Sequence, residues 1–442
     1  SAKCNRNVAQ YKISKGTRAI WMSVVPEKSD VVIIGGGIIG VSTAYYLAKY
    51  GISVTLIEKG KIAGEQSSRN WGFVRQQGRD PAEIPTIMRS LSLWKGLSKE
   101  LDEDTGFKQA GVFYLANNEQ QVAAYEDWLN YAKEYQIDSH LIPKSEIEKY
   151  VPSNSGDWLA ALRTPSDGRA EPSKATGALA KGAERLGAQI LTNCAVFGFE
   201  TEGGRVSSVS TEQGIIKTNS VLCAGGTWSS LFCARHNIPL PQLKIRSSVL
   251  RTSPVPKISE HSIWCRDVAL RRRQDGGYTI AHGSASEAPI VPDTFRWGIK
   301  YIESYKKEKN RLRVKLNGRF YKELMTPRRW NINGPSPFEL ERVYDVSPNK
   351  KILEEAFSNL LKLFPQLINA KIVESWGGLI DVTPDAVPVI SPVEKVPGFF
   401  LATGFSGHGF GIGPGAGELA AQMITGKANK QELLNFDYNR FF

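Results

Sequence analysis

The stretch Val31-Val32-Ile33-Ile34-Gly35-Gly36-Gly37-Ile38-Ile39-Gly40 joins an apolar run to the glycine pattern G-x-G-x-x-G. This pattern between a strand and a helix is typical of a dinucleotide-binding βαβ unit. Residues 41–50 carry apolar residues at helical spacing and stop at Gly51, and residues 54–57 form a second predicted strand that ends in Glu58. The stretch therefore predicts a bound dinucleotide.

Each glycine of this pattern has a steric role. Gly35 makes the tight turn, Gly37 lets the backbone approach the pyrophosphate, and Gly40 allows the helix to pack closely on the strand. The pyrophosphate would lie at the helix N-terminus, where free N–H groups and the helix dipole attract an anion. The Glu58 carboxylate would accept hydrogen bonds from the hydroxyl groups of the adenosine ribose.

The composition indicates a globular protein. The chain has 442 residues, of which 41% are hydrophobic and 23% charged. Its five cysteines show no metal-ligand spacing, so we expect reduced thiols, and the five scattered histidines predict no metal site. No apolar run reaches the roughly 18 residues that a transmembrane helix needs. We therefore expect a cytoplasmic protein, attached at most peripherally to the inner face of the membrane.

Positive charge is concentrated in two segments. Residues 1–21 contain five basic residues and no acidic one, and we expect residues 1–27 to be a leader or an added extension, with a natural start at Met22. Residues 300–329 hold eleven basic and three acidic residues, a net charge of +8. They could bind an anionic membrane or an acidic partner, or they could form a solvated basic face. No nucleic-acid-binding motif accompanies them, so no nucleic acid is expected.

The order of predicted elements divides the chain into two interleaved domains, which gives an α/β fold class. Strand and helix alternation with glycine turns assigns a Rossmann-type dinucleotide-binding domain to residues 28–110, 153–243 and 370–442. Longer strands assign an antiparallel β-sheet substrate domain, with a basic insertion at 300–329, to residues 111–152 and 244–369. In the second domain, Ser347 and Pro348 predict the start of a helix that ends at Phe364.

Several further motifs follow the glycine pattern in order. They are Gly64-Glu65-Gln66-Ser67-Ser68-Arg69-Asn70-Trp71-Gly72, Gly168-Arg169-Ala170-Glu171-Pro172, Val221 to Gly226 with Trp228, Trp376-Gly377-Gly378, Thr383-Pro384-Asp385, Pro388-Val389-Ile390, and Ala402-Thr403-Gly404-Phe405-Ser406-Gly407-His408-Gly409-Phe410. Together they resemble the D-amino-acid oxidase and glycine oxidase superfamily of FAD-dependent oxidoreductases. The similarity runs from about Asp30 to the C-terminus and is closest to bacterial L-amino acid deaminases and D-amino-acid dehydrogenases. It implies a glutathione-reductase-like domain that binds FAD non-covalently, since no cysteine or histidine stands in an attachment motif.

The resemblance also implies where FAD binds. The loop 64–72 would wrap the pyrophosphate, Val196 would bond the adenine through its backbone, and residues 224–225 would let the chain pass close to the cofactor. Residues 404–411 would place a second helix N-terminus, predicted to continue as a helix over 416–424, near the flavin. His408 there could be a structural histidine in a tight loop. Alternatively, the backbone N–H groups beside it could be the donors that act on the flavin. The implied FAD contacts are Gly35, Gly37, Ile38, Ile39, Gly40, Glu58, Lys59, Gln66, Ser67, Ser68, Arg69, Gly72, Val196, Ala224, Gly225, Trp228, Gly378, Gly407, His408, Gly409, Phe410 and Gly411.

One arginine is implied as the substrate-binding group. Arg271 lies where the related deaminases place a carboxylate-binding arginine, and a guanidinium can bind a carboxylate with two bonds. Arg272 and Arg273 follow it, and alternation along a strand would point Arg271 and Arg273 the same way. The triplet could also be a solvated strand end. Phe73 and residues 75–77 depart from the deaminase pattern, which leaves the side-chain specificity open.

The reaction that the resemblance implies is the oxidation of an amino acid or related amine. Hydride would leave Cα of the neutral amine for flavin N5, and the imine would hydrolyse to a 2-oxo acid and ammonia. Oxygen or a quinone would accept the electrons, and no obligatory acid or base side chain is evident. Two alternatives remain: the flavin subunit of a hetero-oligomeric or membrane-linked amine or opine dehydrogenase, and a nicotinamide-dependent Rossmann enzyme. The glycine-rich C-terminal motifs argue against the second.

Overall fold

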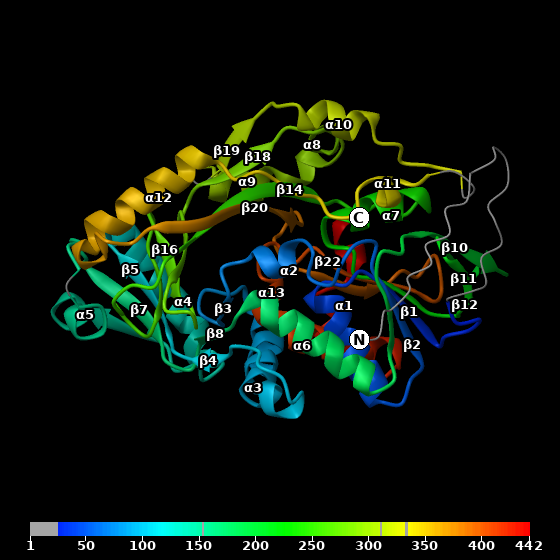
Figure 1. The fold of residues 1–442 in the computed structure, drawn as a ribbon, viewed down its shortest axis with the longest axis horizontal. Coiled ribbons are helices and arrows are strands. Elements are labelled where there is room, and N and C mark those ends of the chain that lie inside the picture. The colour runs from blue at the N-terminus through cyan, green and yellow to red at the C-terminus, as the bar shows by residue number, and fades with distance from the viewer. Residues whose placement is uncertain (1–24, 153, 310–311, 332–334) are drawn as a thin grey trace, which may run out of the picture.

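The computed structural model describes residues 25–152, 154–309, 312–331 and 335–442 (Figure 1). The expected leader, residues 1–27, therefore lies almost wholly outside the described residues. Within the described ranges, no helix combines the length and the apolar character needed to cross a bilayer.

The first half is built on a six-stranded sheet in which all neighbouring pairs but one are parallel. In spatial order its strands are β21 (Val389–Pro392), β22 (Phe399–Thr403), β13 (Val221–Cys223), β1 (Val31–Ile34), β2 (Val54–Ile57) and β9 (Gln189–Leu191). Alternate residues of β1 point to opposite faces of the sheet. Ile33 packs in the hydrophobic core on the face that the helices cover, and Val32 packs in the core on the other face. Both are fully buried, as expected for a parallel sheet that is covered on both faces.

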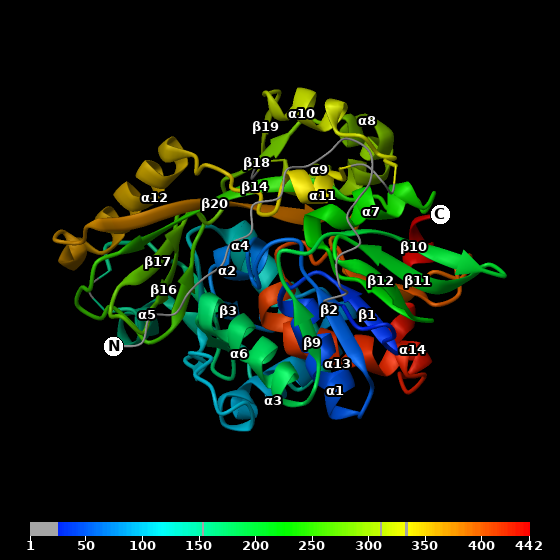
Figure 2. The same ribbon diagram turned by 45° about the vertical axis from the view of Figure 1, so that its right-hand side comes forward.

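Four helices cover one face of this sheet (Figure 2). They are α1 (Ile38–Lys49), α3 (Ile84–Glu100), α6 (Pro172–Arg185) and α13 (Gly409–Ile424). Glycines let α13 approach its neighbours closely: a Cβ on Gly417 would lie 2.3 Å from the Ser42 Cβ of α1. The opposite face carries the helix α7 (Ser229–Arg235) and an antiparallel sheet of β10 (Val196–Glu202), β11 (Arg205–Thr211) and β12 (Gly214–Lys217).

The second half is a ten-stranded sheet. In spatial order it contains β19 (Leu312–Lys315), β18 (Ser286–Pro289), β14 (Leu243–Thr252), β17 (Tyr278–Ala281), β16 (Ala269–Arg272), β15 (Ser262–Trp264), β5 (Val112–Ala116), β7 (Ala160–Thr164) and β6 (His140–Pro143), and β20 (Ile372–Val382) pairs with β14. Most pairs are antiparallel, as predicted, but β15 with β5 and β18 with β19 are parallel, so the sheet is mixed. The helix α12 (Lys350–Leu363) covers one face, and its Leu360 is fully buried there.

At two predicted domain boundaries, a strand that was assigned to the first domain pairs with strands of the second sheet. The first-domain segment that was expected to start at residue 153 contains β7, which pairs with β5 and β6 of the second sheet. The segment expected to start at residue 370 contains β20, which pairs with β14 along its length. We therefore propose that the second half extends to Thr164 at one boundary and to Val382 at the other.

Two helices begin at other residues than predicted. The N-cap of α12 is Asn349, whose Oδ1 accepts the Ile352 N–H at 3.3 Å, and not Ser347. The helix α13 begins at Gly409, so part of the glycine-rich run is itself helical. The remaining α-helices of the described residues are α2 (Gln66–Arg69), α4 (Glu119–Glu134), α5 (Lys144–Tyr150), α8 (Pro292–Trp297), α9 (Ile302–Glu308), α10 (Arg319–Met325), α11 (Pro337–Leu340) and α14 (Lys430–Leu434).

Candidate active site

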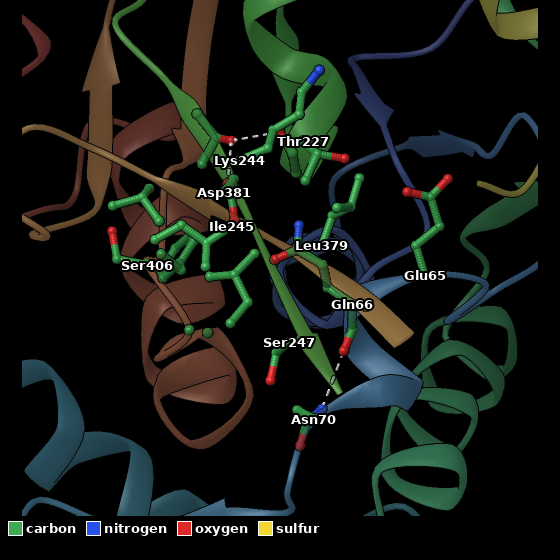
Figure 3. A pocket seen from close by; sticks show the side chains of 18 of the residues that line it. Glu65, Gln66, Asn70, Thr227, Lys244, Ile245, Ser247, Leu379, Asp381 and Ser406 are labelled. Atoms are coloured by element: carbon green, nitrogen blue, oxygen red, sulfur yellow. Dashed lines mark hydrogen bonds between the residues drawn. The ribbon is translucent and has the colours of Figure 1, made fainter. Parts of the chain in front are cut away.

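A cavity of about 1060 Å³ lies where the two halves meet. One wall comes from residues at the carboxyl ends of β1, β2 and β13, which is where ligands bind in open α/β sheets. The other wall comes from β14, β18 and β20. Figure 3 shows the side chains of Lys244, Ile245, Ser247, Leu379 and Asp381 around this space. The volume suits a ligand of dinucleotide size.

The glycine pattern forms the predicted turn between β1 and α1. Gly35 has a φ of +111°, and a Cβ there would lie 2.4 Å from the Ala224 carbonyl oxygen. A Cβ on Gly40 would lie 2.0 Å from the Gly35 carbonyl oxygen. The backbone packing of the fold therefore requires glycine at both positions, whether or not a ligand is bound. Gly37 differs, because it lines the cavity as the N-cap of α1 and its Cβ would meet only Ser67 Oγ, at 3.1 Å.

Glu58 is held at the edge of this turn. Its Oε2 accepts the Gly36 N–H at 2.7 Å, and its Oε1 accepts the Gly60 N–H at 2.8 Å. Burial raises the pKa of this carboxyl, and the two N–H donors oppose that rise. The carboxyl group is thus fixed where the ribose of a dinucleotide on α1 would lie.

The loop 64–72 is tied to the same helix terminus. The Ile38 N–H donates to Ser67 Oγ at 2.8 Å. Gln66 and Asn70 also line the cavity (Figure 3). Ser68 does not, because its hydroxyl donates to the Glu65 carbonyl at 3.3 Å. Of the implied FAD contacts, all but Gly40 and Ser68 line the cavity.

Asp381 closes the cavity at the end of β20. Its Oδ2 accepts the Gly404 N–H at 2.8 Å and a hydrogen bond from Gln242 Nε2 at 3.0 Å. Burial raises the pKa of this carboxyl. Apart from Gly378, the cavity residues of β14 and β20, including Asp381, were not predicted from the sequence, because these strands come together only through long-range pairing.

Arg271 does not line the cavity, which disfavours the carboxylate-binding role that the resemblance implied for it. Its side chain is 1% exposed and donates to the two carboxylate oxygens of Glu171, at 2.9 and 3.2 Å, and to the Trp71 carbonyl at 2.6 Å. Burial would raise the pKa of Glu171, but Arg271 beside it holds that pKa below its usual value. The protein's own carboxylate therefore occupies the position that a substrate carboxylate was expected to take. Arg273 bonds to Asp275 at 3.0 Å and also lies outside the cavity lining.

We expect Arg271→Leu to destabilise the fold, because it leaves the buried Glu171 carboxylate without its partner. The loss should be about 3 to 5 kcal/mol in the free energy of unfolding, measured by urea denaturation. The double variant Arg271→Leu/Glu171→Leu should recover much of it, since two apolar side chains leave no unpaired charge. The control Arg273→Leu should cost below about 1 kcal/mol, because its partner Asp275 is largely solvated. Equal losses in the single and double variants would contradict this account.

Four other arginines line the cavity: Arg69, Arg342, and the two that follow β3 (Phe73–Val74), Arg75 and Arg79. Arg79 is 4% exposed and its Nε donates to the Arg75 carbonyl at 3.2 Å, but its Nη1 has no hydrogen-bond partner among the described residues. Arg75 donates to the Gln77 carbonyl. Burial, and then Arg75, lower the pKa of Arg79 to about 10, so Arg79 stays charged at neutral pH. The only sequence signal for this pair was the departure of residues 75–77 from the deaminase pattern.

His408 lines the cavity as the N-cap of α13. Its Nδ1 lies 3.0 and 3.2 Å from the two carboxylate oxygens of Glu83. Glu83 belongs to the short 3-10 helix Pro81–Glu83, which follows Arg79 in the chain. A carboxylate, a histidine and a partly bonded guanidinium are thus gathered at one wall of the cavity.

Comparison with known proteins decides the family. Residues 30–423 match the profile of the DAO family, described as FAD dependent oxidoreductase. The chain belongs to this family. The superfamily, the α/β fold class and the FAD cofactor that the motifs implied are thereby confirmed, and the DAO-family chain is an oxidoreductase.

Named relatives of this DAO-family chain cover most of its length. It is 28% identical to the sarcosine oxidase subunit beta of an Arthrobacter species, over 92% of this chain and 89% of that subunit. It is 25% identical to the mitochondrial sarcosine dehydrogenase of Mus musculus, over 94% of this chain but only 42% of that longer protein. The solved L-amino acid deaminase of Proteus myxofaciens, in complex with anthranilate, matches with a TM-score of 0.91 and 32% identity, over 95% of this chain and 94% of that one. The L-proline dehydrogenase of P. horikoshii matches with a TM-score of 0.77 and 29% identity, over 94% and 98%.

The residues of the cavity fit FAD. Gly37 provides no capping side chain, so the positive end of the α1 dipole faces the cavity, where a pyrophosphate would be bound. Glu58 is fixed on the ribose side by two N–H donors. The N-terminus of α13, which also lines the cavity, supplies a second positive dipole end to the DAO-family site.

Proposed function

We propose that this chain oxidises the CH–NH group of an amino acid or N-substituted amino acid to an imine. FAD, when bound, would supply the oxidant by accepting a hydride from the carbon attached to the nitrogen. Water then converts the imine to a 2-oxo acid and ammonia, or to an aldehyde and an amine when the oxidised carbon is an N-methyl group. The observation that carries the proposal is one continuous cavity that joins the glycine turn to the buried Arg79 and the partly exposed Arg75. The substrates named for the relatives belong to this class.

Arg79 is the group that would bind the substrate carboxylate. Its Nη1 is buried without a partner, and such an unmet donor costs about 1 to 3 kcal/mol. A carboxylate from the cavity would satisfy it and would place Cα within the same enclosed space, with Arg75 adding a second positive charge. Arg79 and Arg75 thus take the role that the sequence assigned to Arg271.

The test is a panel of amino acids, N-methyl amino acids and simple amines, added without oxygen to the yellow holoenzyme. We expect at least one amine with a carboxylate to bleach the flavin absorbance. Glycine betaine, which has a carboxylate but no nitrogen lone pair, should not bleach it. Dye reduction and a peroxide assay would then separate a dehydrogenase from an oxidase. Acid precipitation should release FAD, as expected for non-covalent binding. A panel in which nothing bleaches the flavin would contradict the proposal.

A second candidate is the flavin subunit of a hetero-oligomeric or membrane-linked dehydrogenase. The match to 89% of a subunit named sarcosine oxidase subunit beta favours it. Purification of this chain alone, followed by turnover with an artificial acceptor, separates the two candidates. Full turnover by the isolated chain would argue against an obligatory partner.

Residues 300–329 are still predicted to contact an anionic membrane. The argument now rests on exposed apolar side chains as well as on positive charge. Six of their basic residues form ion pairs with acidic residues, which lowers the free positive charge: Lys306, Arg313, Lys315, Arg319, Lys322 and Arg328. Large apolar side chains are exposed just before this segment, however, including Phe295 of α8 at 75% and Ile299 of the following 3-10 helix at 86%. The contact would therefore combine apolar insertion with residual charge.

We expect the protein to bind vesicles that contain anionic lipid and to bind neutral vesicles less, with an affinity that falls as salt is added. The variant Phe295→Ser/Ile299→Ser should weaken binding by roughly tenfold or more, because two exposed apolar side chains are lost. Ile215→Ser, which removes an apolar side chain exposed at 63% on β12, should leave binding unchanged. Equal binding to both vesicle types, or none at low salt, would exclude this contact.

A further inference from the structure

The pair of Glu83 and His408 fixes which nitrogen of the imidazole faces the cavity. Nδ1 lies 3.0 Å from a carboxylate oxygen of Glu83, so in the neutral ring Nδ1 carries the proton and Nε2 is the acceptor. The Glu83 side chain is fully buried, whereas 24% of the His408 side chain is exposed and lines the cavity. The buried Glu83 carboxylate therefore orients His408 through Nδ1 and leaves Nε2 for the cavity.

The charged groups around the ring keep it neutral. Burial, and then Arg79, lower the pKa of His408, Glu83 opposes them without outweighing them, and Arg75 lowers the pKa further. Burial would raise the pKa of Glu83, but His408, Arg79 and Arg75 bring that pKa below its usual value. At neutral pH the pair thus consists of an ionised carboxylate and a neutral imidazole, which is the state in which Nε2 can take a proton.

Amine oxidation needs such an acceptor. The nitrogen of an amino acid is an ammonium at neutral pH, and it has no lone pair to form the C=N bond when hydride leaves Cα. A carboxylate bound at Arg79 would place this ammonium near His408, because both side chains line the same wall and Arg79 acts on the pKa of the ring.

We propose that His408 is the catalytic residue that accepts the proton of the substrate ammonium and that Glu83 is the positioning residue that orients it, an inference that rests on the proposed function. One N–H bond of the ammonium breaks and an Nε2–H bond forms, which frees the nitrogen lone pair. With FAD bound as the hydride acceptor, the Cα–H hydrogen would leave together with both electrons of its bond, the lone pair would form the C=N bond, and the imidazolium would return its proton to water.

The first test compares the rate of anaerobic flavin reduction in the wild-type holoenzyme and in His408→Gln as pH is raised. In the wild type this rate should fall only as pH drops through the lowered pKa of His408. In His408→Gln the amine reacts only when it binds already neutral, so the rate should be roughly 10²-fold lower at pH 7 and should approach the wild-type rate near the pKa of the free amine.

Two further variants sharpen this test. Glu83→Gln should show a smaller loss with the same pH dependence, because the amide can still accept from Nδ1–H but carries no charge. His140→Gln, an exposed residue of β6 outside the cavity lining, controls for the loss of any imidazole and should stay within about threefold of the wild type. A loss in His408→Gln that is equal at all pH values, or no loss at pH 7, would overturn the proposal.

A second readout needs no turnover. Nitrogen-15 spectra of the histidine-labelled holoenzyme, assigned by comparison with His408→Gln, should show a neutral ring protonated at Nδ1 at pH 7. A protonated ring, or a ring protonated at Nε2, overturns the proposal whatever the substrate is. An amine panel that reduces no flavin would refute the proposed function and, with it, the proton transfer, while the spectrum would still decide the geometry of the pair.

Discussion

Replacement of Arg79 by methionine is expected to raise the KM for a carboxylate-bearing amine by roughly 30-fold to several thousand-fold. This range corresponds to the 2 to 5 kcal/mol lost when one partner of a desolvated ion pair is removed. Arg79 is 4% exposed and its Nη1 is unpaired, so no solvent or protein group would replace it. Steady-state kinetics with an amino acid and with the corresponding amine that lacks the carboxylate measure the effect. Only the amino acid should be affected.

Two controls separate substrate binding from folding in this experiment. Arg79→Lys should rescue only in part, because an ammonium cannot reproduce the two-bond geometry of a guanidinium. The flavin absorbance and the unfolding midpoint of Arg79→Met should stay close to the wild type. If both substrates lost activity equally, or if FAD were lost, Arg79 would have a structural role and the carboxylate would be bound elsewhere.

Replacement of Gly37 by valine is expected to give a folded protein that has lost nearly all of its FAD. A Cβ at this position meets only Ser67 Oγ, at 3.1 Å, so the fold can accept it if that side chain shifts by a few tenths of an ångström. The added methyl groups would instead occupy the space beside the α1 N-terminus that the pyrophosphate needs. The ratio of flavin to protein absorbance measures occupancy, and circular dichroism measures folding.

Two other glycines provide matched comparisons for Gly37. Gly40→Val should destabilise the fold as well, because a Cβ there would lie 2.0 Å from the Gly35 carbonyl oxygen. Gly96→Ala on α3, where a Cβ meets nothing within 4 Å, should retain both fold and FAD. Stoichiometric FAD in Gly37→Val would show that the pyrophosphate does not approach this residue.

The sequence could predict the parts of the fold that depend on local residue order. The turn at Gly35 and Gly40 follows from sterics within a few residues, and the structure confirms it with a positive φ and a close backbone contact. Motifs spread over the whole chain predicted the superfamily, the FAD cofactor and the α/β class. The predicted FAD contacts other than Gly40 and Ser68 line one cavity, although their contact with FAD stays a prediction.

The errors arose where a partner lies far away in the chain. Arg271 was expected to bind substrate because nothing in its own strand shows that Glu171, a hundred residues earlier, already bonds its guanidinium. The strands β7 and β20, which we propose to assign to the second half, were predicted for the first because their pairing is long-range. Arg79 and Glu83 were not predicted as site residues, because they come close to His408 only in the folded protein.

The bonds of Arg271 also bear on how quickly ligands can exchange. They fasten β16 to the Trp71 backbone and to Glu171, so rotation of one half against the other would break a buried ion pair. The rim of the cavity, by contrast, includes Ile302 and Tyr305 of α9, which are about half exposed. Product release would then depend on rotamer changes of such side chains, on the picosecond to nanosecond scale, instead of on the microsecond to millisecond rotations of whole domains.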